Sequence, residues 1–363
     1  MTDRIDELLV QMTLEEKVSL LSGEDFWSVP AIERLGIGKL RVTDGPNGAR
    51  GGGSLIGGVK SASFPVGIAI GATWNVVLAE EIGAALAEEV KSKNAHMLLA
   101  PTVNIHRSVT NGRNFECYSE DPILSAELAV GYINGLQGQG IGATIKHFVG
   151  NESEIERTTI SSEIGERALR EIYLVPFEWA VKKAGTWGVM SSYNRLNGTF
   201  TSEHNWLLTT VLRDEWGYDG IVMSDWFGSH STAPTVTAGL DLEMPGPARD
   251  RGQKLIDAVQ SGEVSIETLD KRVAAMLHLM QRVGSLDDHR PFQERADNRP
   301  EHRDLIRRAG AEAAVLLKND GMLPIAGSGP IAVIGPNART AQIMGGGSAQ
   351  LNAHYRVSPW DGL

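Results

Sequence analysis

The sequence predicts an α/β fold: a (β/α)8 barrel of the TIM type, followed by the beginning of a second α/β unit. Three apolar stretches that read as strands end abruptly in polar side chains, namely in Asp44, in Lys146 and His147, and in Asp225. Helical and strand-like patterns alternate along the chain, which is typical of a parallel sheet. Polar groups at the C-terminal ends of several parallel strands are the way in which such a barrel builds a catalytic pocket.

Size and composition limit the class of protein. The chain has 363 residues and a mass of 39.2 kDa, enough for a barrel of roughly 250 residues and an additional piece. The net charge of −11 argues against a nucleic-acid partner, because phosphate binding needs clustered cations. No apolar run approaches the ~20 residues that cross a bilayer, and the N-terminal residues lack the apolar stretch of a secretory signal. Cys117 is the only cysteine, which leaves no internal disulfide. We therefore expect a cytoplasmic protein without a membrane partner.

Strands and helices are expected to alternate as far as residue 284. Thr13-Leu-Glu-Glu16 is a capping box that opens a short helix, and Asp121-Pro122 pairs a helix cap with a proline in the first turn. Pro176 is expected to break or kink its helix. Strands are predicted at 39–44, 68–73, 97–103, 142–147, 188–193, 220–225 and 239–244, and helices at 76–94, 122–138, 163–183, 205–216, 251–261 and 266–283. These are about seven strands where a complete barrel has eight.

The chain divides into three parts by composition. Residues 1–284 are expected to form the catalytic barrel, and the polar segment 285–299 reads as a linker. Residues 300–363 begin a new α/β unit, with a helix over 300–317 and a strand over 330–335. A unit of about sixty residues buries little apolar surface alone, so we expect it to be incomplete and to pack on another part of the protein.

Asp225 is the leading candidate for a catalytic residue. A carboxylate at a strand end, flanked by Trp226 and Phe227, can attack an electrophilic carbon or stabilise a cation. A lone Ser-Asp pair in this position would more often cap the helix that follows. The aromatic neighbours and the other polar strand ends favour the catalytic interpretation.

Lys146 and His147 form the second candidate group. Adjacent residues on a strand point to opposite faces, but at the end of a strand the chain can turn and bring both into a pocket. Two donors there suit a hydroxyl-rich substrate or an anion. The alternative is a hydrogen-bonded buried histidine with a lysine that extends to water. Asp44 precedes Gly-Pro-Asn, a turn signature, and either serves that turn or accepts two sugar hydroxyls.

Four further candidates have equally good structural explanations. Arg107 and Arg157 are either binding residues or solvated charges, and Met190 and Tyr193 either bind ligand or pack in the core. Tyr193 is the stronger of the two, because a buried hydroxyl needs a partner. None of the nine histidines forms His-x-His or His-Glu-x-x-His, and one cysteine excludes a thiolate cluster. We expect neither a metal nor a cofactor.

Five motifs carry a family resemblance when they are taken together. They are Thr43-Asp-Gly-Pro46, Gly112-Arg-Asn-Phe-Glu-Cys-Tyr-Ser-Glu-Asp-Pro122, Lys146-His-Phe148, Met190-Ser-Ser-Tyr-Asn194 and Ser224-Asp-Trp226. The set resembles glycoside hydrolase family 3, and its order and spacing match the β-glucosidase branch. The resemblance implies a (β/α)8 barrel followed by an α/β sandwich, and hydrolysis of terminal β-linked sugars with retention of configuration.

The resemblance also implies roles for individual residues. Asp225 matches the family's nucleophile, which would form a covalent glycosyl-enzyme that water resolves. The charges of Lys146 and Arg107 would keep this carboxylate ionised. The residues that match or neighbour the binding site of the non-reducing sugar are Asp44, Arg107, Lys146, His147, Tyr193, Arg157, Met190 and Trp226.

Two departures from the family pattern refine this prediction. Val149-Gly-Asn-Glu-Ser replaces the His-bearing loop of the branch that cleaves N-acetylglucosaminides, so that substrate is not expected. The β-glucosidase branch takes its acid/base glutamate from the second domain, so we expect this residue outside the chain. The expected partner is the C-terminal remainder of the same enzyme, in which many relatives carry an extra β-rich domain.

The sequence therefore predicts a retaining β-glucosidase that acts together with this remainder on a β-glycoside or oligosaccharide. One alternative is a fragment that binds sugars or a partner chain without turnover. A second is a β-xylosidase or arabinosidase of the same family. A third, a metal-dependent barrel hydrolase, is opposed by the histidine pattern.

Overall fold

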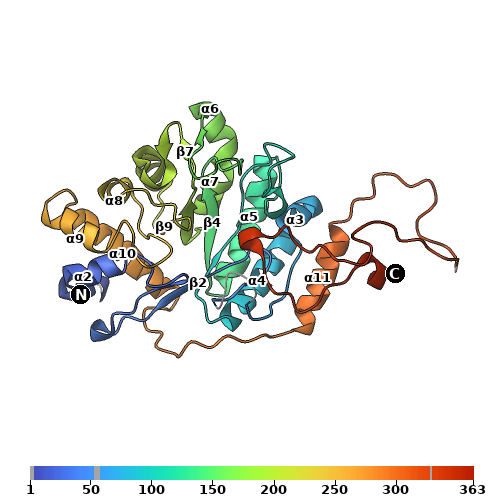
Figure 1. The fold of residues 1–363 in the computed structure, drawn as a ribbon, viewed down its shortest axis with the longest axis horizontal. Helices are drawn as coiled ribbons and strands as arrows, with labels where there is room; N and C mark the ends of the chain where they lie inside the picture. The colour runs from blue at the N-terminus through green and yellow to red at the C-terminus, as the bar shows by residue number, and fades with distance from the viewer. Residues whose placement is uncertain (1–3, 53–57, 328) are drawn as a thin grey trace.

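A six-stranded sheet lies at the centre of the molecule, a computed structural model that describes residues 4–52, 58–327 and 329–363. Its strands, in spatial order, are β1 (Ser28–Val29), β2 (Leu40–Asp44), β3 (Met97–Leu99), β4 (Gly142–Phe148), β6 (Gly188–Ser191) and β9 (Ile221–Ser224). Strands β2, β3, β4, β6 and β9 are parallel neighbours, and β1 is antiparallel to β2. The C-terminal ends of the parallel strands therefore meet at one edge of the sheet (Figure 1).

Main-chain hydrogen bonds continue the sheet beyond β9 and lead back towards β1. Segment 241–244 bonds to β9 on one side, with 2.9 Å from Ser224 N to Leu242 O. On its other side it bonds to the N-terminal part of the chain, with 3.0 Å from Gly23 N to Glu243 O. Glu24 N in turn donates to β1 at 2.8 Å. The strand predicted at 239–244 is thus reduced to isolated bridges.

Helices cover the outside of this sheet. The pairs in closest contact are α4 (Val76–Ser92) with α5 (Pro122–Gly138), and α5 with α7 (Val175–Lys182). Helix α10 (Ile266–Arg282) packs on α1 (Arg4–Gln11), α2 (Leu14–Ser19) and α8 (Ala233–Ala238). The remaining α-helices are α3 (Gly67–Thr73), α6 (Glu166–Ala168), α9 (Gln253–Gln260), α11 (Pro300–Glu312) and α12 (Pro359–Gly362).

The remaining elements are short or irregular. Strands β5 (Ser161–Ser162), β7 (Arg195–Leu196) and β8 (Thr199–Phe200) form a small second sheet. The elements η3 (Leu169–Tyr173) and η5 (Trp206–Glu215) are π-helices. The 3-10 turns are η1 (Glu33–Leu35), η2 (Asn114–Glu116), η4 (Thr201–Glu203) and η6 (Gly347–Ala349). No helix among the described residues combines the length and the apolar character that a bilayer crossing requires.

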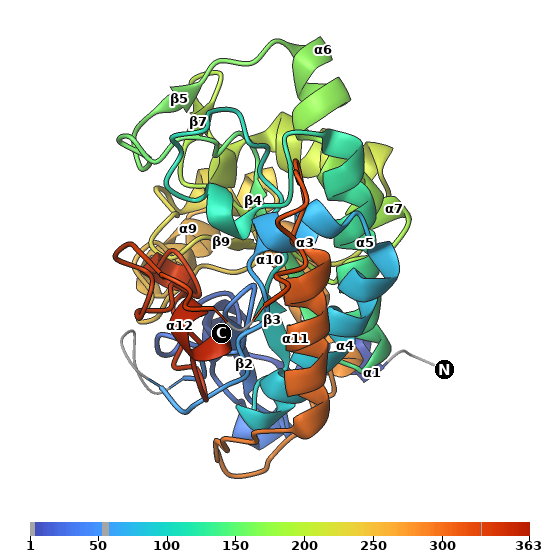
Figure 2. The same cartoon turned by 90° about the vertical axis from the view of Figure 1, so that its right-hand side faces the viewer.

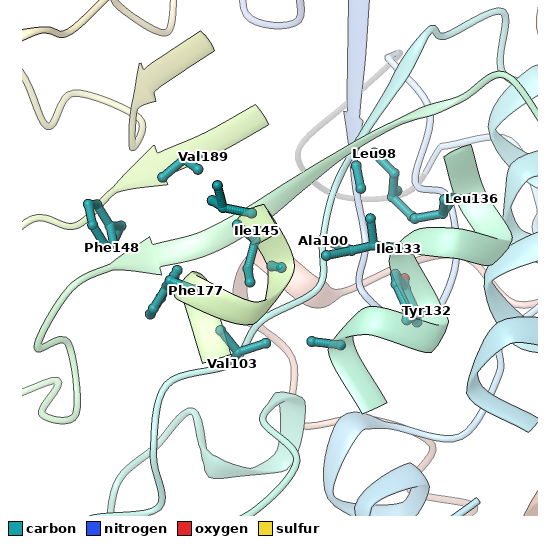
Figure 3. Close-up of a cluster of buried hydrophobic side chains, with 14 of the residues drawn as sticks. Leu98, Ala100, Val103, Tyr132, Ile133, Leu136, Ile145, Phe148, Phe177 and Val189 are labelled. Carbon is teal, nitrogen blue, oxygen red and sulfur yellow. The ribbon is translucent and has the colours of Figure 1, made fainter. Parts of the chain in front are cut away.

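Apolar packing between strands and helices explains why the strands read as apolar runs. Figure 3 shows Ile145 and Val189, from β4 and β6, beside Phe177 of α7 and Ile133 of α5. Every residue of β4 is buried, as expected for a strand of a parallel sheet that is covered on its faces. Because the core takes the apolar side chains, the polar ones at the strand ends stand out in the sequence.

Several local predictions are confirmed. Thr13 and Glu16 form the reciprocal capping box of α2, and the Asp121 side chain accepts from the first-turn N–H groups of α5. The helix predicted at 163–183 is interrupted at Leu174, two residues before Pro176. The prolyl ring lacks the N–H that an uninterrupted helix needs.

The strand predicted at 68–73 is wrong, because this segment is helix α3. A short apolar run fits a buried helix as well as a strand. The deciding contacts are remote in sequence: a Cβ on Gly67 would lie 2.2 Å from Glu116 O, and one on Gly71 would lie 2.1 Å from Tyr118 O. The helix can approach the chain at 116–118 only because both positions are glycine.

The strand predicted at 330–335 is also absent. Helix α11 ends at Glu312 instead of 317, and residues 330–334 have no secondary structure, with Ile334 91% exposed. An extended segment becomes a strand only where a neighbour pairs with its N–H and C=O groups. Helix α11 itself runs alongside α4 (Figure 2), where His302 and Ala309 are buried.

Candidate active site

A cavity of about 210 Å³ opens at the C-terminal ends of β2, β4, β6 and β9. It is smaller than the roughly 300–1,000 Å³ of pockets for drug-sized ligands, and its size suits a single sugar ring. Its lining consists of Phe26, Trp27, Asp44, Arg50, Leu99, Arg113, Lys146, His147, Arg157, Met190, Tyr193, Asp225, Trp226, Gly347 and Ser348. All the residues predicted for the site are therefore brought together except Arg107.

Asp225 follows β9 directly and is 7% exposed. The Trp226 N–H donates to its Oδ1 at 2.7 Å. Its Oδ2 is buried and accepts no hydrogen bond within 3.5 Å among the described residues, although it lies 3.5 Å from His147 Nε2. The Tyr193 side chain interacts with the same carboxyl group and favours its charged form. This oxygen retains its lone pairs and lies in the pocket wall, so it is the atom from which a bond to a ligand can form.

The pKa of Asp225 is raised above its usual value, because burial penalises the charged carboxylate. The positive charges of Arg113 and Lys146 oppose this effect without cancelling it. The sequence led us to expect that Lys146 and Arg107 favour the ionised form of this carboxylate, and Lys146 does so. The cations are present, but one of them is Arg113 in place of Arg107, and burial outweighs them.

Lys146 and Asp44 form a buried ion pair between the ends of β4 and β2. Lys146 Nζ lies 2.7 Å from Asp44 Oδ1, and the side chains are 2% and 8% exposed. The same oxygen accepts from Gly45 N at 2.8 Å, so part of the expected turn chemistry is present as well. The pair fixes two hydrogen-bonding groups in the pocket wall at a defined separation.

Lys146 and His147 both line the pocket although they are consecutive in β4. The pairing of β4 with β6 shifts register between Ile145 and Phe148, and such an irregularity re-aims side chains at a strand end. The His147 Nε2 lies 3.1 Å from Arg113 Nη1. Burial, together with the charges of Arg113 and Lys146, lowers the pKa of His147 well below its usual value, so the imidazole is neutral.

The prediction that Arg107 lines the pocket is not met by the structure. It is exposed and lines a separate depression with Glu152 and Tyr173. The guanidinium in the pocket belongs to Arg113, whose Nε donates to the buried Glu116 Oε1 at 2.6 Å. Arg113 lies inside the motif 112–122, and its spacing of three from an acidic residue was the signal that could have identified it.

Aromatic side chains form one side of the pocket. Trp27 and Trp226 have ring centroids 5.4 Å apart, and Trp226 Nε1 donates to Phe26 O at 3.1 Å. Across the pocket the Arg157 guanidinium lies 4.7 Å from the centre of the Tyr193 ring. Amphipathic rings with fixed orientations offer an apolar surface beside polar groups, which matches the two-sided character of a sugar.

A segment distant in sequence completes the wall. Arg50 is 3% exposed, and its guanidinium donates to the carbonyl oxygens of Gly347 at 3.3 Å, of Gln350 at 2.9 Å and of Ser348. The Ser348 hydroxyl accepts from Arg113 Nη2 at 3.5 Å. Arg50 thus holds residues 347–350 against the pocket residues that follow the strands of the central sheet. Nothing in the sequence connects these positions, and sequence reasoning missed them.

The carboxylates in the pocket lining limit the reactions that these residues can perform alone. Asp44 and Asp225 are the carboxylates among the lining residues, and Asp44 is bonded to Lys146. Within residues 4–52, 58–327 and 329–363, no three His, Cys, Asp or Glu side chains converge as a metal site would require. The arrangement places a buried carboxylate among side chains that can donate to and accept from the hydroxyl groups of a ligand.

Two family models match this chain. Residues 37–279 match the glycosyl hydrolase family 3 N terminal domain, and residues 314–363 match the family's C-terminal domain. A β-glucosidase of Rhizobium radiobacter is 66% identical over 361 residues, which are 99% of this chain and 44% of that protein. β-Glucosidase B of Emericella nidulans is 50% identical over 366 residues, or 99% of this chain and 43% of that protein.

Solved structures are similar over nearly the whole chain. β-Glucosidase from Kluyveromyces marxianus, in complex with glucose, has a TM-score of 0.94 and 42% identity, covering 99% of this chain and 45% of that one. β-Glucosidase 3B from Thermotoga neapolitana, in complex with α-D-glucose, has a TM-score of 0.92 and 38% identity, covering 99% and 54%. The chain shares their α/β fold and spans less than half the length of the curated relatives described above.

Proposed function

The chain belongs to glycosyl hydrolase family 3, and from this premise we propose that it is part of a retaining β-glucosidase that removes terminal, non-reducing β-linked glucose. The observation that carries the proposal is Asp225 Oδ2, which is buried in a pocket of sugar size and accepts no hydrogen bond within 3.5 Å among the described residues. The names of the relatives and the glucose in two similar structures support this choice of sugar.

The reaction follows from the position of Asp225. Its Oδ2 attacks the anomeric carbon while the bond from that carbon to the leaving oxygen breaks, which gives a covalent glycosyl-enzyme. A water molecule then attacks the same carbon, returns the carboxylate and leaves glucose with its original configuration. Asp44, Lys146, Arg113 and His147 bind the sugar hydroxyls and hold the ring in line with the nucleophile.

We propose that the acid/base carboxyl comes from the C-terminal remainder of the same enzyme. Retaining glycosidases place it roughly 5–5.5 Å from the nucleophile, and the other lining carboxylate, Asp44, is already bonded to Lys146. The chain's share of its curated relatives, 44% and 43%, supports a missing contribution.

The family membership also suggests how the chain is divided into domains. We propose that residues 1–284 form a barrel of the (β/α)8 type, that 285–299 are a linker, and that 300–363 begin an α/β sandwich. The hydrogen bonds that lead from β9 through segment 241–244 back to β1 support the barrel. A buried, unpaired Cys117 fits a reducing compartment, and we propose the cytoplasm.

A mechanism-based label tests the nucleophile. A 2-deoxy-2-fluoro-β-glucoside with a good leaving group needs little acid assistance, so we expect it to label the chain with one sugar on Asp225. Peptide mapping by mass spectrometry locates the adduct, and Asp225→Asn is the control that should remain unlabelled. An adduct on any other residue would overturn the assignment.

A second candidate is a sugar-binding unit without turnover of its own, favoured by the lack of a free second carboxylate in the lining. Co-expression with the C-terminal half of a close relative separates the two. Hydrolysis that appears only in the mixture supports the glucosidase, whereas glucose binding without hydrolysis in either sample supports the binding unit.

A further inference from the structure

We propose that Asn104 is a positioning residue that holds His147 as the neutral imidazole with its hydrogen on Nδ1, and thereby keeps Asp225 Oδ2 free of an ion pair with His147. The catalytic consequence rests on the proposed glucosidase function. The state of the imidazole does not, and it can be measured separately.

The backbone places Asn104 beside His147. The segment after β3 runs along the end of β4, with 3.0 Å from Lys146 N to Pro101 O and 2.9 Å from Val103 N to Lys146 O. Asn104 follows in this segment and is 3% exposed. Its amide therefore reaches the next residue of β4 without contact with solvent.

Hydrogen bonds determine which way the Asn104 amide faces. Its Nδ2 donates to His147 O at 3.0 Å and to Glu152 Oε1 at 3.4 Å, and its Oδ1 accepts from His147 N at 2.9 Å. The reversed amide would set its oxygen against two acceptors and its NH2 group against a donor. The neighbours thus fix Oδ1 on the side of the imidazole.

The imidazole tautomer follows from this orientation. Asn104 Oδ1 lies 3.1 Å from His147 Nδ1, and a carbonyl oxygen can only accept, so Nδ1 carries the hydrogen. On the other side of the ring, Arg113 Nη1 lies 3.1 Å from Nε2, and a guanidinium can only donate. Both contacts are satisfied by the Nδ1–H tautomer and not by the Nε2–H tautomer.

The charges around the ring keep it neutral. Arg113, Lys146 and Arg157 present positive charge to the imidazole, and together with burial they lower the pKa of His147. The Asp225 carboxylate faces Nε2, and Glu152, whose pKa burial raises to about 7, lies behind Asn104. A neutral amide at position 104 adds no negative charge that would stabilise an imidazolium.

The neutral tautomer matters because His147 Nε2 is 3.5 Å from Asp225 Oδ2. An imidazolium would donate its Nε2 hydrogen to that oxygen and form an ion pair. Such a pair stabilises the carboxylate in the free enzyme, and this stabilisation is lost as the oxygen bonds to carbon. With a lone pair on Nε2, the nucleophilic oxygen keeps its reactivity.

The first test is nitrogen NMR of the imidazole in this chain, with the His147 signals assigned through His147→Gln. We expect the Nδ1–H tautomer, and we expect the ring to remain neutral at the pH at which an exposed histidine is half protonated. An Nε2–H tautomer in the unsubstituted protein would overturn the proposal. The tautomer is read from the unsubstituted protein, and the measurement needs no catalytic activity.

The second test is Asn104→Asp, which places a carboxylate at Nδ1 and is expected to raise the pKa of His147, because a neighbouring negative charge favours the imidazolium. Asn111→Asp adds the same charge at a residue whose side chain bonds to Asn114 and not to His147, and is the matched control. In a protein joined to the C-terminal remainder, we expect kcat to fall about tenfold at pH 6 with KM little changed, and to recover at higher pH.

The outcomes separate the two proposals. An Nδ1–H tautomer in a protein that never hydrolyses a glucoside contradicts the proposed function and leaves the positioning role intact. Hydrolysis whose pH profile is the same in Asn104→Asp and in the unsubstituted enzyme overturns the positioning role, whatever the function.

Discussion

Lys146 Nζ donates to Asp44 Oδ1 at 2.7 Å, joining the ends of β4 and β2 across the intervening β3. Both side chains are nearly buried, so each charge depends on the other for its compensation. Removing one partner of such a pair leaves an unpaired charge in a medium of low polarity, which is far more costly than removing both.

Lys146→Met is therefore expected to lower the free energy of unfolding by about 3–5 kcal/mol. The double variant Asp44→Asn with Lys146→Met is expected to recover most of this loss, because no buried charge is left. Urea unfolding of the three proteins measures both effects. If the double variant were as unstable as the single one, the ion pair would not be the cause.

Asp225→Asn is expected to abolish hydrolysis and to stabilise the fold at neutral pH. Because the pKa of Asp225 is raised in the folded protein, folding favours its protonated form. The ionised carboxylate therefore costs stability as the pH rises through the folded pKa, and costs nothing below the unfolded value of about 3.9.

A gain of about 1 kcal/mol, or roughly 2–4 °C in Tm, is the expected scale at pH 7. The gain should vanish near pH 3, where both proteins are neutral at this position. Scanning calorimetry at the two pH values measures it. A Tm of Asp225→Asn below that of the unsubstituted protein at pH 7 would contradict the prediction.

Arg113→Ala is expected to weaken glucose binding at least tenfold, because the guanidinium contacts the His147 ring and the Ser348 hydroxyl in the pocket wall. Loss of a hydrogen bond to a charged group costs about 1.5–3 kcal/mol. Arg107→Ala is the matched control on the same loop and should bind glucose normally. Isothermal titration calorimetry measures the affinity of both variants for glucose. If Arg107→Ala bound glucose more weakly than Arg113→Ala, Arg107 would be the binding residue, as the sequence predicted.

Arg50→Met is expected to release residues 347–350 from the pocket wall. The variant keeps much of the aliphatic length and loses the donors to three backbone carbonyls. We expect weaker glucose binding and faster proteolysis in the 345–353 region. Arg356→Ala, an exposed cation in the same part of the chain, controls for charge. Equal protease sensitivity in the two variants would show that Arg50 does not hold the segment.

The sequence predicted well those features that depend on local chemistry and on burial. Polar residues at the ends of apolar strands led directly to Asp44, Lys146, His147 and Asp225, and all four line one pocket. Helices with clear caps, such as α2 and α5, begin where they were expected. These signals are carried by residues close together in the chain.

The errors share a different origin. Helix α3 was mistaken for a strand because its identity depends on contacts of Gly67 and Gly71 with residues 116–118. Arg107 was predicted and Arg113 was missed; both are arginines on one loop, and only the fold decides which enters the pocket. The same is true of Arg50, whose partners lie about 300 residues away. Local patterns carry no information about such distant contacts.

The hydrogen bonds from Arg50 to residues 347–350 have a thermodynamic consequence. A glucose molecule in the pocket would contact residues 347–350 and also the residues at the strand ends, since Ser348 and Asp225 line the same cavity. Two coupled binding events affect each other equally. If the contact of residues 347–350 with the pocket wall increases the affinity for glucose, then bound glucose stabilises that contact by the same free energy. Saturating glucose should therefore slow hydrogen exchange at residues 345–353, a part of the chain that carries no nucleophile.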